Sequence, residues 1–141
     1  MLRVQERFQT LEVDLSLKDN LPSVRGNNDQ LRQVLFNILI NAADAMPKGG
    51  TLSIRSKHEK QWVVIAIKDT GMGIAVEDLD KIYDPFFTTK SPDKGTGLGL
   101  SISLKIVEEL GRRLKVRSEL GKGTEFIMYL RAEARNAKNI S

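Results

Sequence analysis

The sequence predicts an α+β domain in which helices accompany a sheet of short strands. Apolar residues recur at helical spacing in two segments, residues 28–45 and 100–110. Short segments in which apolar and polar residues alternate flank these helices, and glycine, proline and asparagine mark turns between them. The chain has 141 residues, 40% of them hydrophobic, and no cysteine, so we expect one domain that folds without disulfides.

The first half of the chain begins with a strand and continues with the longer helix. Apolar side chains alternate with polar ones over residues 11–17, which is typical of a half-buried strand. Asn28 or Asp29 can cap the helix that follows, because both residue types accept hydrogen bonds from free helical N–H groups. Pro47 and the glycines after it end this helix.

Two hairpins and a long connection make up the second half. Strands are predicted at 51–56 and 62–68, and a further hairpin at 114–130. Between the hairpins lies a connection over 70–99 that contains only one short predicted helix, at 77–83. Loops of this length are uncommon in compact domains unless they cover a binding site, so we interpret the connection as a lid.

The single histidine, His58, falls in the polar turn predicted at 58–61. No helical apolar pattern surrounds it, so we interpret it as a surface turn residue. Phosphoryl transfer to a histidine within this chain is therefore not expected.

The charge of the chain gives little indication of a nucleic-acid partner. The formal net charge is +4, but 22 basic residues are spread among 18 acidic ones. Basic residues gather partly in 112–117 and 131–138, and they are not interleaved with aromatic residues along the sequence. No apolar stretch approaches the roughly 20 residues that span a membrane, and no signal peptide opens the chain. We therefore expect a cytoplasmic location, no direct membrane insertion and no nucleic-acid partner.

Three glycines within five residues, Gly95, Gly97 and Gly99, directly precede the second helix. Glycine at this density indicates a backbone that adopts positive φ or lies against a ligand, since each costs roughly 0.5–1 kcal/mol relative to alanine. Free N–H groups at a helix N-terminus bind anions, phosphate above all. The loop therefore predicts a phosphate site, and an ordinary glycine-rich turn is the alternative.

Asn37, Asn41 and Asp44 lie at i, i+4 and i+7 of the first helix, along one line of its surface. Asparagine is a poor helix former, so two of them in an apolar helix indicate a role beyond helix formation. Carboxamide oxygens suit a hard cation such as Mg²⁺ that bridges phosphates. The alternative is a set of ordinary polar residues on the solvent-exposed face.

The strand at 62–68 runs directly into Asp69, which is followed by Gly71 and Gly73. A carboxylate at a strand end can accept a hydrogen bond from an N–H donor, and glycines one residue apart let the backbone fold over a flat ligand. An Asp-containing turn without a ligand is the alternative.

Four separated segments, in order, resemble the sequence boxes of sensor histidine kinases. The segments are QVLFNILINAADAM, similar to the N box, DTGMGI, similar to the G1 box, IYDPFFTTK, similar to the F box, and GTGLGLSIS, similar to the G2 box. The later segment GKGTEF resembles the hairpin that completes the same pocket. The resemblance covers about residues 10–130 and extends to the wider ATPase group that includes type II topoisomerase heads and mismatch-repair ATPases.

The resemblance implies a fold as well as a function. It implies a two-layer α/β sandwich of the Bergerat ATP-binding type, in which a mixed, mostly antiparallel sheet carries three helices on one face. Residues 1–130 are then the histidine kinase catalytic and ATP-binding domain, and residues 131–141 form a frayed C-terminal tail.

The resemblance also implies roles for individual residues. Asn41 is similar to the Mg²⁺ ligand, and Asn37 lies beside it facing the phosphates, so both are the implied catalytic residues. Asp69 is similar to the carboxylate that accepts the adenine amino group. The full set of residues implied to bind the nucleotide is Asn37, Asn41, Ala45, Asp69, Gly71, Gly73, Ile74, Thr88, Thr89, Lys90, Gly95, Thr96, Gly97, Leu98, Gly99, Leu100 and Thr124.

Two residues depart from the pattern of the family. Asp44 stands where many members carry lysine or arginine, so a phosphate contact from this position is not expected. Arg112 replaces the second glycine of a common pair, so the turn after the second long helix is expected to differ.

The implied activity is transfer of the γ-phosphate of Mg²⁺-bound ATP to a histidine on another domain. In this family that domain is a helical bundle, usually dimeric, which passes the phosphate to a response regulator. Phosphoryl transfer requires little covalent chemistry from the protein, because positioning and charge neutralisation dominate. The sequence contains no helical histidine segment of its own.

Two other functional classes remain open. ATP-hydrolysing members of the wider group, and a related type of protein-serine kinase, typically place a glutamate four residues before the asparagine that binds Mg²⁺. Here that residue is Asn37, whose amide cannot accept a proton at neutral pH, which disfavours both. The other class is a non-catalytic nucleotide-binding module, although the intact boxes give it no support.

Overall fold

The computed structural model describes residues 11–19, 21, 28–84, 99–109 and 113–132. The secondary-structure elements are, in chain order, β1 (Leu11–Ser16), α2 (Asn28–Asp44), β2 (Gly50–Glu59), β3 (Trp62–Asp69), the 3₁₀ helix η1 (Val76–Asp78), α3 (Gly99–Glu109), β4 (Arg113–Glu119) and β5 (Gly123–Arg131).

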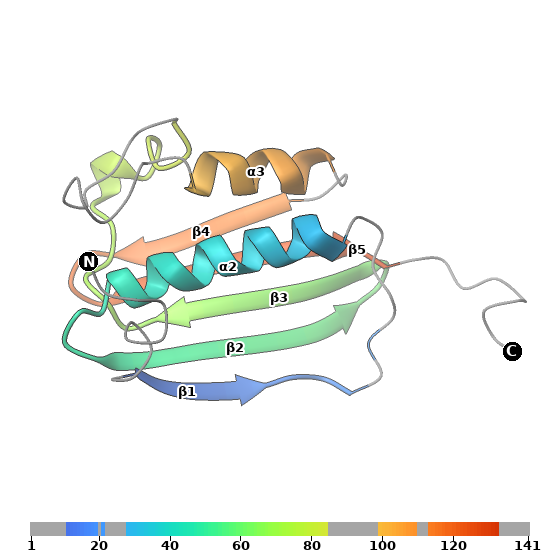
Figure 1. Ribbon diagram of the computed structural model, residues 1–141, viewed down its shortest axis with the longest axis horizontal. Helices are drawn as coiled ribbons and strands as arrows, with labels where there is room; N and C mark the ends of the chain where they lie inside the picture. Colours follow the sequence, from blue (N-terminus) through green and yellow to red (C-terminus); the bar gives the residue numbers. More distant parts are fainter. Residues whose placement is uncertain (1–10, 20, 22–27, 85–98, 110–112, 133–141) are drawn as a thin grey trace, which may run out of the picture.

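In this part of the chain, five strands form a sheet in the order β1-β2-β3-β5-β4. β1 runs parallel to β2, and the remaining neighbours are antiparallel. α2 provides the crossover that a parallel pair requires. Figure 1 shows α2 and α3 on the same side of the sheet, and the two helices contact each other. The predicted α+β class, with a mixed, mostly antiparallel sheet and helices on one face, is confirmed.

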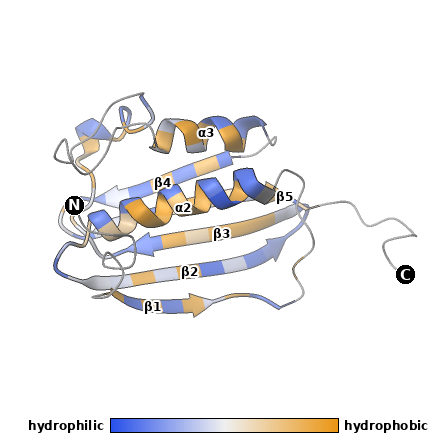
Figure 2. Cartoon of the chain, in the orientation of Figure 1, coloured by the Kyte–Doolittle hydropathy of each residue, from blue (hydrophilic) through white to orange (hydrophobic). Residues whose placement is uncertain are grey.

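The hydrophobic core lies between the sheet and the inward sides of α2 and α3. Val34 and Ile38, one turn apart on α2, are 0% and 1% exposed. Val107 of α3 and Met128 of β5 are similarly inaccessible and belong to the same cluster. Figure 2 shows hydrophobic residues along most of β3, the central strand of the sheet. This packing fixes the position of α2, and therefore of the asparagine line that it carries.

The prediction of a helix at 77–83 is wrong. The structure has a 3₁₀ helix over Val76–Asp78, followed by turns through Tyr83. The backbone N–H groups here donate to carbonyls three residues earlier, as in the bond from Lys81 to Asp78 at 2.8 Å. An α-helix requires bonds to carbonyls four residues earlier, so the segment turns more tightly than predicted.

His58 lies within β2, opposite Val63, and not in the turn predicted at 58–61. Lys60 adopts a left-handed conformation with φ 55°, which lets Lys60 and Gln61 alone close the hairpin. Both strands therefore extend further than predicted. The exposed position expected for His58 is nevertheless confirmed.

The half-buried character predicted for residues 11–17 is also wrong. Val13 and Leu15 of β1 are more than half exposed. β1 is an edge strand, and α2 packs against α3 and β3, so the side chains of β1 receive little cover from the helix layer.

Replacing Ile38 by alanine should lower the free energy of unfolding by about 2–5 kcal/mol, because a buried cavity is left in the core. Phe36→Ala on the same helix is the control, since Phe36 is 51% exposed and its loss should cost about 1 kcal/mol or less. Urea unfolding of both variants measures the difference. Equal losses would contradict the assignment of the buried side of α2.

Candidate nucleotide-binding site

Asp69 is a buried carboxylate at the C-terminal end of β3. Its side chain is 3% exposed. The Oδ1 atom accepts hydrogen bonds from the backbone N–H groups of Gly71 at 2.9 Å and Thr124 at 3.2 Å. These bonds join the end of β3, the loop after it and the start of β5. Asp69 and Thr124, both predicted to bind the nucleotide, are thus in direct contact.

The loop after Asp69 is held between α2 and the hairpin that joins β4 and β5. A β-carbon on Gly71 would lie 2.5 Å from the carbonyl oxygen of Ala45, just after the end of α2. Gly73 has φ +73°, and a β-carbon there would overlap the carbonyl group of Glu119. The two predicted glycines are therefore required by close backbone approach on opposite sides of the loop.

Ser118 connects the same loop to the hairpin, and it was not among the residues predicted from the sequence. Its hydroxyl accepts a hydrogen bond from the N–H of Ile74 at 2.7 Å and donates to the carbonyl of Gly123 at 2.9 Å. It also lies 2.8 Å from the hydroxyl of Thr124. Ser118 therefore connects Ile74 and Thr124, two of the residues predicted to bind the nucleotide.

Asn37, Asn41 and Ala45 follow one line of α2 toward the Asp69 loop. They are four residues apart, so the line covers about 12 Å of helix. At its far end the side-chain amide of Asn37 donates to the hydroxyl of Ser103 at 3.2 Å, and Ser103 is fully buried on α3. At the near end the Met72 N–H donates to the Ala45 carbonyl at 3.1 Å. The line therefore connects α3 to the Asp69 loop.

Ser103 was also not identified as a site residue, although it stands in the GTGLGLSIS segment. A single serine in a helix carries no periodic signal. Only the packing of α3 on α2 shows that it orients the amide of Asn37.

The remaining predicted residues are only partly within the described ranges. Gly99 and Leu100 form the first turn of α3, as the predicted loop-to-helix junction requires. The following predicted residues lie outside the described residues: Thr88, Thr89, Lys90, Gly95, Thr96, Gly97 and Leu98. Arg112 lies outside them as well.

The chemistry of the described residues fits a metal ion that is coordinated mostly by phosphates and water, with few protein ligands. No group of three or more histidine or acidic side chains arranged to bind a metal occurs in the described ranges. Mg²⁺ commonly retains several waters and takes one or two protein oxygens plus phosphates. Asn41 is partly exposed, and its amide oxygen is one hard ligand of the type that such a site uses.

A comparison with known protein families matches residues 26–134 to the family described as histidine kinase-, DNA gyrase B-, and HSP90-like ATPases. The chain belongs to this family. Within it, the chain is a catalytic and ATP-binding domain of the histidine kinase type, as its relatives and structural neighbours are sensor kinases.

Sporulation kinase E of Bacillus subtilis is 40% identical over 131 residues, which cover 92% of this chain and 18% of that kinase. The chain thus spans less than a fifth of this relative. Among solved structures, the mycobacterial sensor histidine kinase MprB superposes with a TM-score of 0.81 at 26% identity, covering 94% of this chain and 89% of that one.

Full-length ShkA in complex with AMPPNP superposes with a TM-score of 0.77 at 27% identity. The match covers 93% of this chain and 27% of ShkA. AMPPNP is a non-hydrolysable ATP analogue, so a neighbour within the family is known with an ATP-like ligand.

None of the helices that the structure describes combines the length and apolar character needed to cross a membrane.

Burial raises the pKa of Asp69 above its ordinary value of 3.8, and the hydrogen bonds from Gly71 and Thr124 offset part of the rise. When a carboxyl has a higher pKa in the folded state than in the unfolded state, its ionisation lowers the free energy of unfolding. The stability of the wild type relative to Asp69→Asn should therefore fall as pH rises from 3.8 through the raised pKa, then level off. Urea unfolding of both proteins across this range measures the difference. A rise with pH would contradict the burial of this carboxyl.

Proposed function

We propose that this domain binds Mg²⁺-ATP and transfers the γ-phosphate to a histidine on a separate helical-bundle domain. Membership of the ATPase family supports ATP binding in general. The observation that carries the finer proposal is the continuous series of contacts from Asp69 through Gly71 and Ala45 to Asn37 and α3.

Asp69 is proposed to recognise the adenine base. Both backbone hydrogen bonds go to Oδ1, so Oδ2 is the oxygen assigned to accept the exocyclic amino group of adenine. Gly73, Ile74 and Thr124 are proposed to surround the same base. The contacts of Ser118 with Ile74 and Thr124 support this proposal. A charge-assisted bond of this kind contributes about 1.5–3 kcal/mol and discriminates against a base that lacks the donor.

The phosphates are proposed to lie along α2 and toward the N-terminus of α3. The N–H groups of the first turn at Gly99 and Leu100 suit an anion, and Asn41 is the proposed protein ligand of Mg²⁺. When bound, this ion neutralises phosphate charge. Asn37 lies on the same side of α2 as Asn41, and Ser103 orients its amide. Asn37 is proposed to position the triphosphate. Thr88, Thr89, Lys90 and the loop 95–98 are proposed to complete the phosphate contacts.

Asn37 favours transfer to a protein histidine over transfer to water. Hydrolysis benefits from a side chain that accepts a proton from the attacking water, and a carboxamide does not accept one at neutral pH. A histidine imidazole already presents a lone pair, so positioning suffices. Steady ATP hydrolysis is the alternative activity, and the experiment described below distinguishes it from transfer to histidine.

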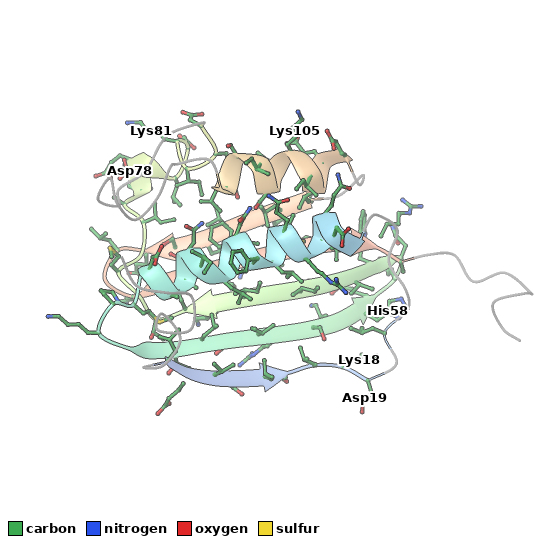
Figure 3. The ribbon with its side chains drawn as sticks, viewed as in Figure 1. Lys18, Asp19, His58, Asp78, Lys81 and Lys105 are labelled. Carbon is green, nitrogen blue, oxygen red and sulfur yellow. The ribbon has the colours of Figure 1, made fainter. Side chains whose placement is uncertain are left out.

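The accepting histidine is proposed to lie outside this sequence. His58 is six residues along β2 from Leu52, the residue opposite Asp69, which corresponds to about 20 Å of strand. Figure 3 shows His58 at the far end of β2, away from Asp78 and the loops on the other side of the molecule. The proposed partners are a dimeric helical-bundle domain in the same kinase and, through it, a response regulator.

The proposed domain boundary needs one adjustment. β5 continues through Arg131, and the Ala132 N–H donates to the Gln61 carbonyl at 2.8 Å. The sheet therefore continues past residue 130. We propose that the catalytic domain includes these residues and that the tail begins after them.

The experiment mixes the domain with a purified helical-bundle histidine domain from a related sensor kinase and γ-labelled ATP. The domain should label the bundle and not itself. Asn41→Ala should lower transfer at least about 100-fold through lost metal positioning. Asp69→Asn should weaken ATP binding about 10–100-fold, since its oxygen can keep both backbone bonds while its NH₂ opposes the adenine amino group.

His58→Ala is the matched control and should leave both transfer and ATP binding unchanged. Phosphohistidine at His58, or undiminished transfer by Asn41→Ala, would contradict the proposal. Steady ATP turnover without transfer to the bundle would instead indicate a hydrolase.

A further inference from the structure

The face of the sheet opposite α2 and α3 carries a second organised surface. In the described part of the chain, both helices lie on the other face (Figure 1). Residues directly opposite each other on neighbouring strands share a face. Two rows cross β4, β5, β3 and β2 on this open face, in this order: Arg113, Tyr129, Val64 and Lys57 in one, and Lys115, Ile127, Ala66 and Arg55 in the other.

Each row has an apolar centre between two cations. Val64 and Ile127 are only 4% and 8% exposed, although they do not belong to the cluster that packs beneath the helices. Long basic side chains bury their aliphatic stems along such apolar positions while their charged ends remain in water. The cations at the row ends are all exposed.

Trp62 and Tyr129 extend the centre of this surface. Their rings pack edge to face, with centroids 6.4 Å apart and an interplanar angle of 87°. The Lys115 ammonium lies 5.2 Å from the Tyr129 ring centroid, and the Arg131 guanidinium lies 5.9 Å from that of Trp62. These cation–π contacts restrain two of the basic side chains of this face.

The charge of this surface is unbalanced over the strands β2, β3, β5 and β4. Their outward-facing carboxylates are Glu59, Glu119 and Glu125, of which Glu59 is ion-paired with Lys57 at 2.8 Å and Glu119 with Lys122 at 3.4 Å. On the edge strand β1 the same face adds two exposed carboxylates, Glu12 and Asp14, opposite Thr51 and Ser53. The exposed cations on β2 to β4 of the same face are Arg55, Lys57, Lys68, Arg113, Lys115, Arg117 and Arg131.

Two simpler explanations account for only part of this arrangement. Basic residues on an edge strand such as β4 discourage pairing with other chains, but here the cations continue onto the inner strands β5 and β3. A membrane-binding surface needs exposed apolar side chains, whereas Val64 and Ile127 are buried.

An apolar centre that contains tyrosine and tryptophan and is surrounded by arginines is typical of a protein-binding surface. A single-strand nucleic-acid site requires ring faces on which bases stack. Here each ring already carries a cation over one face and contacts the other ring. The basic residues are not interleaved with aromatic ones in the sequence, and only the pairing of β3, β5 and β4 brings them together.

We propose that this face, centred on Tyr129 and Ile127, is a docking surface for an acidic, carboxylate-rich protein surface. Four arginines and three lysines match carboxylates by charge, and arginine does so with two parallel hydrogen bonds. The surface is separate from the residues assigned to ATP, so docking and nucleotide binding are independent properties of the domain.

The test uses Trp62, the only tryptophan of the chain, as a fluorescence reporter within the surface. The domain is titrated with poly-L-glutamate and, separately, with oligothymidylate of equal charge and with phosphatidylserine vesicles. Poly-L-glutamate should change the Trp62 emission most strongly, and raising salt from roughly 0.05 to 0.3 M should weaken the effect, because the Debye length shortens.

Lys115→Glu/Arg117→Glu should weaken this binding at least about tenfold, through repulsion in place of attraction. Lys81→Glu/Lys105→Glu is the matched control, with the same charge change on exposed residues elsewhere (Figure 3), and should weaken it less than about twofold. The neutral pair Lys115→Gln/Arg117→Gln gives the same test with smaller structural disturbance. ATP affinity, measured in parallel, should stay unchanged in all three variants.

Three results would overturn the proposal. The first is no change in Trp62 emission with poly-L-glutamate at low salt. The second is equal weakening in the control pair, which would indicate general charge attraction. The third is tighter binding of oligothymidylate or vesicles, which would assign the face to a nucleic acid or a lipid surface.

Discussion

The hydrogen bonds from two backbone N–H groups to Oδ1 of Asp69 are the constraint on which the site depends. They join the end of β3, the following loop and the start of β5. Asp69 and Thr124 are 55 residues apart in the sequence. Burial opposes an ionised carboxylate here, and the two N–H groups compensate in part. Because β3 and β5 are inner strands of the sheet, the remaining oxygen of Asp69 is held in a fixed direction.

From this anchor the rest of the arrangement follows by close packing. Gly71 and Gly73 allow the loop to lie directly against Ala45 and Glu119, so no side chain separates the loop from α2 or from the hairpin. α2 then carries Asn41 and Asn37 away from the loop toward α3. Catalysis of phosphoryl transfer relies on positioning, and here rigid elements supply it. The open face of the sheet takes no part in these contacts, which leaves it available for a partner.

The sequence predicted the parts of the site that rest on residue type and spacing. Asp69 with two following glycines, and asparagines four residues apart, are chemically unusual enough to be recognised without coordinates. Ser118 and Ser103 were not found, because an isolated serine has no pattern and its role depends on which elements lie beside it. The helix at 77–83 was wrong because three- and four-residue hydrogen-bond spacing produce similar apolar patterns over one turn. The exposed side chains of β1 and the basic open face depend on strand order, which composition does not reveal.

The most direct test of the central claim is a structure of this domain with an ATP analogue and Mg²⁺. We expect the adenine amino group within about 2.7–3.2 Å of Asp69 Oδ2. We also expect the ion on the amide oxygen of Asn41 and the phosphates between α2 and the N-terminus of α3. A nucleotide bound elsewhere, or a base whose amino group contacts neither Asp69 nor a water held by it, would contradict the account.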